Sequence, residues 1–187
     1  MADTPPKKPK QEFGAPVPDF SLPRVSGGTS SLQRVLEGKK GALIVFWSDT
    51  CSHCIRYDSY FNSFAEKHPE LGFVAIASRK GEDLEHVKET AAQRSLSFPV
   101  LHDRDSAVAQ RWFVQQTPRV FLIDPERRLL YRGAVDNFML PKDPEYRAYL
   151  EPAIEEFLAG KPISRPETTS FGCAIQSVYY VLPQPLS

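Results

Sequence analysis

The sequence predicts an α/β fold in which helices cover both faces of a mixed central sheet, giving three layers. The apolar runs 41–47 and 71–77 have the length and composition of strands that are buried on both faces. Segments with helical spacing follow these runs, so strands and helices alternate along the chain. Two later apolar runs, 120–123 and 129–132, flank an Asp-Pro turn and indicate a hairpin, which adds antiparallel strands to the parallel ones.

The remaining elements follow from short patterns. Phe20 and Leu22 alternate with polar residues before a Gly-Gly turn, which indicates a strand, and the apolar residues of 32–36 outline a short helix. The spacing of four aromatic residues predicts one amphipathic helix from Cys51 to near His68. Further segments are expected as a helix at 83–95, a strand at 98–101, a helix at 106–113 and a last helix at 146–157 that stops before Gly160.

Composition bounds the class of protein. The 187 residues carry 23 Lys plus Arg and 23 Asp plus Glu, and this balance argues against binding to nucleic acid. With 41% hydrophobic residues the chain is globular, and this length normally forms one domain. No run of 18 apolar residues occurs, so no membrane span is expected.

The ends of the chain differ from its middle. Residues 1–13 are rich in Pro and Lys and are expected to form a disordered arm, followed by one domain over 14–160. Residues 161–187 are expected to form a Pro-rich tail that contains Cys173. Within this tail, 177–182 is interpreted as an extra strand or a docking segment.

Two of the three cysteines, Cys51 and Cys54, have C-x-x-C spacing, which indicates redox or metal chemistry. At the start of a helix the first sulfur lies beside unpaired N–H groups, which stabilise the reactive thiolate. The second sulfur, one turn later, is placed to attack a mixed disulfide and release the partner. When protonated, His53 adds a positive charge that favours the thiolate.

Other interpretations of this segment remain open. Cys51, His53 and Cys54 are also candidate zinc or copper ligands, although a structural zinc site needs four ligands and no second paired cluster is present. Burial of the two thiols as small hydrophobic groups is disfavoured by their polar neighbours. Either Asp49 or Thr50 is expected to cap the helix.

Several motifs together resemble the thioredoxin superfamily over about 14–160. They are FW-x-x-x-C-x-x-C after a buried strand, and Thr117-Pro118 before the strand 119–124. The opening APVPDFSL at 15–22 resembles the redoxin branch, the alkyl hydroperoxide reductase and thiol-specific antioxidant-like proteins, which includes exported thiol-disulfide reductases. The C-terminal pieces resemble a peroxiredoxin-like subgroup with a GC-x-I segment; they are 159–163, Glu167-Thr168 and 172–175.

The resemblance implies a thioredoxin-like three-layer α/β/α sandwich and assigns roles to particular residues. Cys51 is then the nucleophile, Cys54 the resolving thiol, and Pro118 a cis-proline whose neighbouring backbone pairs with the bound partner chain. The substrate groove is expected to include Trp47, a residue that mainly packs, together with Thr50 and Thr117.

This sequence departs from two patterns of the superfamily. Thioredoxin proper has a buried acid six residues before the first Cys, and Val45 occupies that position here. Glu82, Glu85 and Asp103 are candidates to replace it. The peroxiredoxin signature P-x-x-x-[TS]-x-x-C, aligned on Cys54, lacks its Pro and its Thr or Ser, so the peroxide pocket is incomplete.

The sequence therefore predicts a thiol-disulfide oxidoreductase that exchanges disulfides with protein partners and needs no cofactor. A thiol-dependent peroxidase acting on peroxides, and a metal carrier on the same fold, are the alternatives. Cys173 is interpreted as a third redox thiol that folds back on the pair, or else as a packed free thiol. The protein is expected to be a monomer in the periplasm or exported, and a cytoplasmic location is the alternative.

Overall fold

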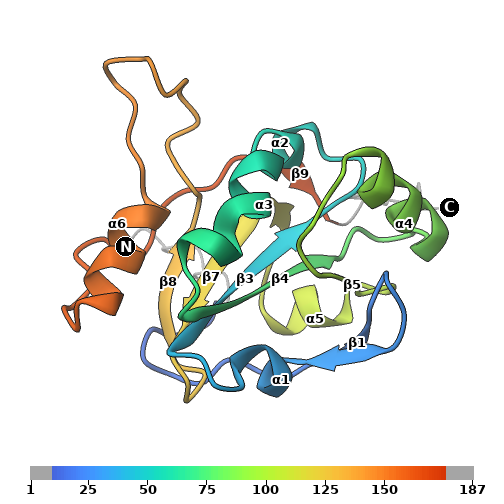
Figure 1. Ribbon diagram of the computed structural model, residues 1–187, viewed down its shortest axis with the longest axis horizontal. Helices are drawn as coiled ribbons and strands as arrows, with labels where there is room; N and C mark the ends of the chain where they lie inside the picture. The colour runs from blue at the N-terminus through green and yellow to red at the C-terminus, as the bar shows by residue number, and fades with distance from the viewer. Residues whose placement is uncertain (1–9, 176–187) are drawn as a thin grey trace, which may run out of the picture.

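The computed structural model describes residues 10–175 and has a mixed central sheet of five strands in the order β5-β4-β3-β7-β8 (Figure 1). Strands β3, β4 and β5 are parallel, whereas β7 is antiparallel to β3 and β8 is antiparallel to β7. These strands span Gly41–Trp47 (β3), Leu71–Ala77 (β4), Val100–His102 (β5), Arg119–Ile123 (β7) and Leu129–Gly133 (β8). The α/β class and the mixed sheet are as predicted.

Helices cover both faces of this sheet. One face packs against α3 (Asp58–Lys67), α4 (Leu84–Gln93) and α6 (Leu150–Leu158), and the other against α1 (Leu32–Leu36) and α5 (Ala107–Arg111). Strand β3 contributes to both cores because its side chains alternate: Leu43, Val45 and Trp47 face the first, and Ala42, Ile44 and Phe46 the second. The strand that leads into the cysteines is therefore buried on both sides.

Helix α1 lies close to the sheet because the facing position on β4 is a glycine. A Cβ at Gly72 would lie 2.0 Å from the carbonyl oxygen of Val35. A short hairpin of β1 (Ser21–Pro23) and β2 (Thr29–Ser31) precedes this helix, and the turn between these two strands contains the predicted Gly27-Gly28 pair.

The helix expected to run unbroken from the cysteines is divided in two. A single turn, α2 (Ser52–Ile55), ends at Arg56, and α3 begins at Asp58. Between them Tyr57 is buried and its hydroxyl donates to Asp136 Oδ1 at 2.6 Å. This tertiary contact fixes Tyr57 at the junction, and periodicity alone does not reveal it.

The part of the expected tail that the structure describes, 161–175, packs against the domain. It runs from α6 to strand β9 (Cys173–Ala174), which pairs with β6 (Gln116–Thr117) in a separate two-stranded sheet beside α2 (Figure 1). Ile175 is buried in the same core as α1 and α5. Residues 1–9 and 176–187, including the segment 177–182 interpreted above, lie outside the described residues.

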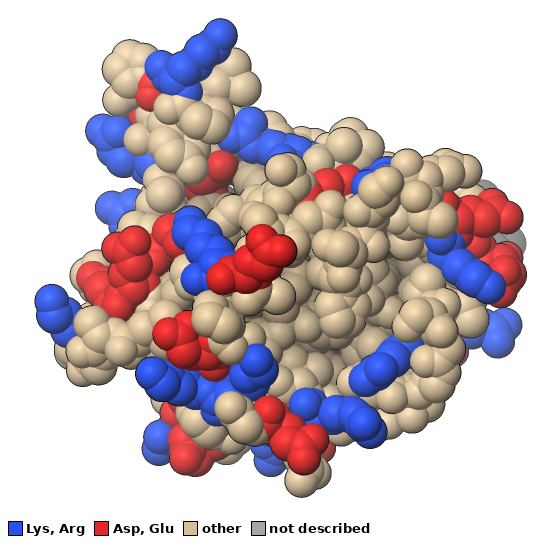
Figure 2. Space-filling view, in the orientation of Figure 1, with Lys and Arg blue, Asp and Glu red and all other residues tan. Residues whose placement is uncertain are grey.

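Acidic and basic side chains are interspersed on the face shown in Figure 2, with no large area of a single sign. This distribution agrees with the balanced composition. Among residues 10–175, no helix is both long and apolar enough to cross a membrane.

Candidate active site

The two cysteines of the C-x-x-C motif lie where β3 leads into α2, and both are free thiols. Cys51 is the residue that precedes the helix, so neither Asp49 nor Thr50 caps it, contrary to expectation. Both sulfur-bearing residues are completely buried (0% exposed). The expectation that polar neighbours keep the pair exposed is therefore wrong, because a segment distant in sequence, 170–175, packs here.

Hydrogen bonds converge on the sulfur of Cys51. As a thiol, Cys51 Sγ donates to the carbonyl oxygen of Thr117 at 3.2 Å. As a thiolate it accepts from the thiol of Cys54, then from Cys173 and from the side chain of Thr117, and these bonds lower its pKa to about 4 although burial opposes the shift. Cys51 is thus ionised at neutral pH.

Cys54 has the opposite character. Burial first, and the neighbouring Cys51 thiolate second, raise the pKa of Cys54 well above its usual value. The two thiols are chemically unequal: the outer one is a stable thiolate and the inner one holds its proton. This asymmetry suits a nucleophile paired with a resolving thiol.

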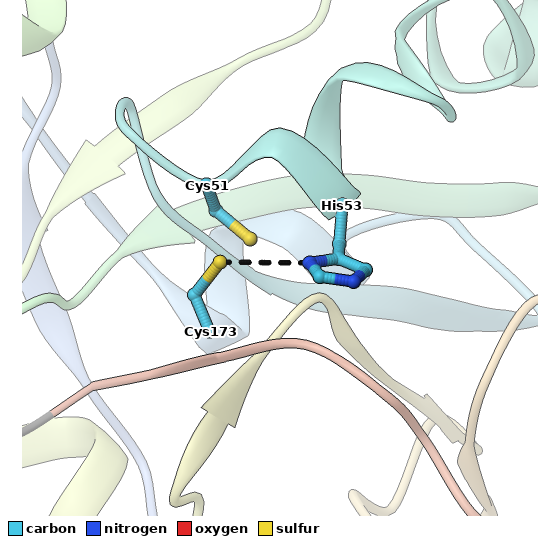
Figure 3. A group of neighbouring side chains, drawn as sticks. All are labelled: Cys51, His53 and Cys173. Carbon is cyan, nitrogen blue, oxygen red and sulfur yellow. Dashed lines mark hydrogen bonds between the residues drawn. The ribbon is translucent and has the colours of Figure 1, made fainter.

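The third cysteine joins this site. The ligand atoms of Cys51, His53 and Cys173 all lie within 4.8 Å of one another, and Cys173 Sγ lies 3.6 Å from His53 Nδ1 (Figure 3). Burial and the neighbouring Cys51 raise the pKa of Cys173. Cys173 thus lies beside Cys51 and His53, a position that both earlier interpretations, a third redox thiol and a packed free thiol, allow.

The loop before β7 forms the other side of the site. The Thr117-Pro118 peptide bond is cis, as the resemblance implied. Thr117 is buried because Cys173 lies opposite it in the β6–β9 pair. Thr50 is exposed at the surface of the site, whereas Trp47 is fully buried under the guanidinium of Arg94 and packs beneath the groove rather than lining it.

Of the three acids proposed to replace the missing buried one, Glu82 lies next to the loop that carries the cysteines. Its carboxyl group accepts hydrogen bonds from Ser48 Oγ (3.1 Å) and from the backbone N–H of Asp49 (2.7 Å). Burial and the nearby Asp49 raise the pKa of Glu82 to about 8. Glu85 is exposed, and Asp103 is buried but bonds to Ser78 and to the first turn of α5.

Sequence patterns missed three charged or titratable residues on and around α4 that contact this loop, namely Arg79, His86 and Arg94. Burial disfavours ionisation of Asp49, but hydrogen bonds with Glu82 and His86, aided by Arg79, lower its pKa overall. Arg94 pairs with Asp58 on α3 and donates to the carbonyl oxygen of Asp49. The position of α4 against the loop is a tertiary feature, so no local signal identified these contacts.

The residues that offer metal-binding atoms differ from those expected. Within 10–175, the residues whose potential metal-ligating atoms lie close together are Cys51, His53 and Cys173, and Cys54 is not one of them. Two thiols and one imidazole are ligands that zinc and copper accept, but they are one short of a closed tetrahedral site.

A thioredoxin-like sheet that carries a reactive C-x-x-C pair beside a cis-proline loop defines a thiol-disulfide oxidoreductase. The chain belongs to the AhpC/TSA family, which it matches over residues 13–132. This result confirms the resemblance to the redoxin branch that the opening motif indicated.

Named relatives and solved structures agree with this class. Thiol-disulfide oxidoreductase ResA of Bacillus cereus is 30% identical over 123 residues, covering 66% of this chain and 70% of the relative. Thiol-disulfide oxidoreductase YkuV of Bacillus subtilis is 28% identical over 118 residues, 61% of this chain and 80% of that protein. A hypothetical protein of Sinorhizobium meliloti has a similar structure, with a TM-score of 0.78, 28% identity, and coverage of 89% of this chain and 95% of that one.

Proposed function

We propose that this protein exchanges disulfides with partner proteins, with Cys51 as the nucleophile and Cys54 as the resolving thiol. The observation that carries the proposal is the set of hydrogen bonds that converge on Cys51 Sγ while the proton stays on the buried Cys54. A thiolate is the attacking species in disulfide exchange, and only one of the two thiols is suited to this role at neutral pH.

The exchange proceeds in two displacements. The Cys51 thiolate attacks one sulfur of a partner disulfide, so a mixed disulfide forms and the partner's other sulfur leaves as a thiolate. This step removes the negative charge of Cys51, which is one of the causes that raise the pKa of Cys54. Cys54 then loses its proton and attacks Cys51 Sγ, which forms the Cys51–Cys54 disulfide and releases the reduced partner. The reverse sequence oxidises a dithiol.

His53 and Pro118 have positioning roles in this proposal. The His53 ring contacts Cys173 and lies against Phe138, with ring centroids 5.1 Å apart, so the imidazole is held beside the reactive sulfurs. Pro118 follows Thr117, whose carbonyl oxygen contacts Cys51 Sγ. Thr117 and Pro118 therefore form the wall of the groove against which a partner strand would lie.

Variants of the two cysteines test these roles. Cys51→Ser should abolish reduction of a disulfide-containing model peptide while the circular dichroism spectrum stays native. Cys54→Ser should instead accumulate a mixed disulfide between Cys51 and the peptide. Full exchange activity in Cys51→Ser, with its fold intact, would refute the assignment.

The geometry disfavours a dedicated peroxidase. By alignment with the peroxiredoxin signature, the peroxide-reacting thiol would be Cys54, and burial together with the Cys51 thiolate keeps Cys54 protonated. A peroxidase of that kind should still consume hydrogen peroxide when Cys51 is replaced. We expect Cys51→Ser to consume none above the buffer rate.

A metal carrier is the second candidate, and the grouping of Cys51, His53 and Cys173 within 4.8 Å is the observation that favours it. Protein purified in reductant and measured for zinc and copper should carry either metal at a molar ratio near one if this candidate holds. A ratio near zero, in protein that exchanges disulfides, would exclude it.

We also propose an extracytoplasmic location and a monomeric state. Disulfides of partner proteins persist in oxidising compartments, so an enzyme that exchanges them has its substrates there. Fractionation of the source cells with an antibody against the protein tests the location. Light scattering of the reduced protein, expected to give the mass of one chain, tests the oligomeric state.

A further inference from the structure

The proposed nucleophile is covered by the chain's own C-terminal segment. Cys51 is 0% exposed, yet a thiol that attacks a partner disulfide must be reachable. Cys173, on strand β9, packs against the core cluster that contains both active-site cysteines. The C-terminal segment must therefore move before Cys51 can reach a partner disulfide.

Strand β9 is bound in the way that an extended partner segment binds to an exposed strand edge. Cys173 lies opposite Thr117 and Ala174 opposite Gln116 in antiparallel register. The pairing continues one residue further, because the N–H of Ile175 donates to the carbonyl oxygen of Gln115 at 3.0 Å. Addition of a strand through main-chain hydrogen bonds is a general mode of peptide recognition. Here the chain itself supplies the strand.

Contacts specific to this segment hold it at the edge. A Cβ at Gly172 would lie 1.8 Å from the carbonyl oxygen of Thr117, so glycine alone permits this approach. The hydroxyl of Ser170 accepts hydrogen bonds from Gln116 Nε2 (3.0 Å) and Arg119 Nη1 (3.2 Å). Burial of Ile175 anchors the far end. The docked position is thus encoded by several side chains and not only by two backbone pairs.

The docking brings a third sulfur to the reactive one. Figure 3 shows Cys51 and His53 projecting from the start of α2, and Cys173 projecting toward them from the C-terminal segment on the other side. The sulfurs lie within 4.8 Å, and a disulfide needs about 2.05 Å, so a change of side-chain rotamers has to close the gap. His53 Nδ1, at 3.6 Å from Cys173 Sγ, is placed to accept the thiol proton.

We propose that residues 170–175 are an internal pseudosubstrate, which occupies the partner's place on β6 and forms a Cys51–Cys173 disulfide by exchange with the Cys51–Cys54 disulfide. The inference rests on the proposed role of Cys51 as the nucleophile. A partner that binds along the same edge must first displace β9. The site is therefore closed in the free protein, and the internal disulfide keeps it closed.

The exchange step is balanced without an outside oxidant. Starting from the Cys51–Cys54 disulfide, Cys173 gives its proton to His53 and its thiolate attacks Cys51 Sγ. The Cys51–Cys173 bond forms as the Cys51–Cys54 bond breaks, and Cys54 leaves as a thiolate that takes up the proton from His53. One disulfide replaces another, and the reverse step reopens the site.

A variant without the resolving thiol tests the covalent link. Cys54→Ser is incubated with oxidised glutathione, alkylated and mapped by peptide mass without reduction. Cys51 first forms a mixed disulfide with glutathione, and Cys173 then displaces reduced glutathione. In Cys54→Ser we expect most of Cys51 to be recovered linked to Cys173. In the double variant Cys54→Ser/Cys173→Ser we expect Cys51 to be recovered linked to glutathione. Recovery of Cys51 only as its glutathione adduct in the single variant would overturn the proposal.

The Cys173→Ser variant in the same buffers separates this inference from the proposed function, because it cannot form the Cys51–Cys173 disulfide. If Cys51 and Cys54 form no disulfide there, the proposed function fails. If they form one while the Cys54→Ser variant shows no link to Cys173, only the pseudosubstrate fails.

A second variant displaces the strand without touching a thiol. Gly172→Ala should raise the rate at which iodoacetamide alkylates Cys51 several-fold, because the added methyl collides with the backbone of Thr117. Ala174→Ser, an exposed position on the same strand, is the matched control and should react at the wild-type rate. Natively folded Gly172→Ala that reacts no faster than the control would contradict the covering role of β9.

Discussion

Replacement of Cys54 by Ala should raise the pKa of Cys51, because the thiol of Cys54 is the foremost donor to the Cys51 thiolate. A hydrogen bond to a charged group is worth about 1.5–3 kcal/mol, and a thiol is a weak donor, so the lower end applies. Since one pKa unit corresponds to about 1.36 kcal/mol, the loss raises the pKa by about one unit. We therefore expect it to move from about 4 toward about 5.

The ultraviolet absorbance of the thiolate, followed against pH in the reduced protein, measures this shift. Cys173 does not interfere at low pH, because burial and its proximity to Cys51 raise its pKa. Cys54→Ser is the matched control: its hydroxyl replaces the thiol as donor and should keep the pKa of Cys51 near the wild-type value. An unchanged pKa in Cys54→Ala would refute the idea that the inner thiol stabilises the outer thiolate.

Three further predictions concern pH and the docked segment. Because the pKa of Cys51 is lowered in the folded protein, the unfolded chain binds more protons than the folded chain between about pH 4 and about pH 9. As pH rises through this window, the thermal stability of the reduced protein should therefore increase relative to that of the disulfide form. The raised pKa of Glu82 has the opposite sign: stability should fall as pH rises from about 4.5 through about 8 in the oxidised protein. Glu82→Gln should remove this fall, whereas the exposed Glu85→Gln should retain it. Thr168→Val should lower the free energy of unfolding by about 1–3 kcal/mol, because it removes the hydroxyl that accepts a hydrogen bond from the buried backbone N–H of Ala134. The same substitution should speed hydrogen exchange in β9, whereas the exposed Thr169→Val should change neither the stability nor the exchange. An effect of equal size in both threonine variants, or no pH difference between the two glutamine variants, would contradict these assignments.

The sheet was predictable because its strands carry strong local signals. The runs 41–47 and 71–77 are continuously apolar, and the structure has strands with these same bounds. A strand buried on both faces must be apolar at every position, so its limits can be read from composition. The helix after the cysteines was predicted less well, because the contact of Tyr57 with Asp136 depends on a loop about 80 residues away.

The candidate site was predicted in part. The C-x-x-C pair and the proline loop were found from spacing and resemblance, and Cys173 was considered because a glycine precedes it in a tail that was expected to be flexible. The burial of Cys51 was not predicted, because it results from the pairing of β9 with β6, two strands of two residues each. Such short strands have no periodicity to detect. Gly172 was the available signal, since glycine often marks a close backbone approach.

A redox titration in glutathione buffers, with alkylation and peptide mass mapping of all three cysteines, tests the central claim most directly. We expect Cys51 and Cys54 to be oxidised together as a two-electron couple. If the two remain independent free thiols across the whole range of buffers, the protein is not a thiol-disulfide oxidoreductase that acts through this pair.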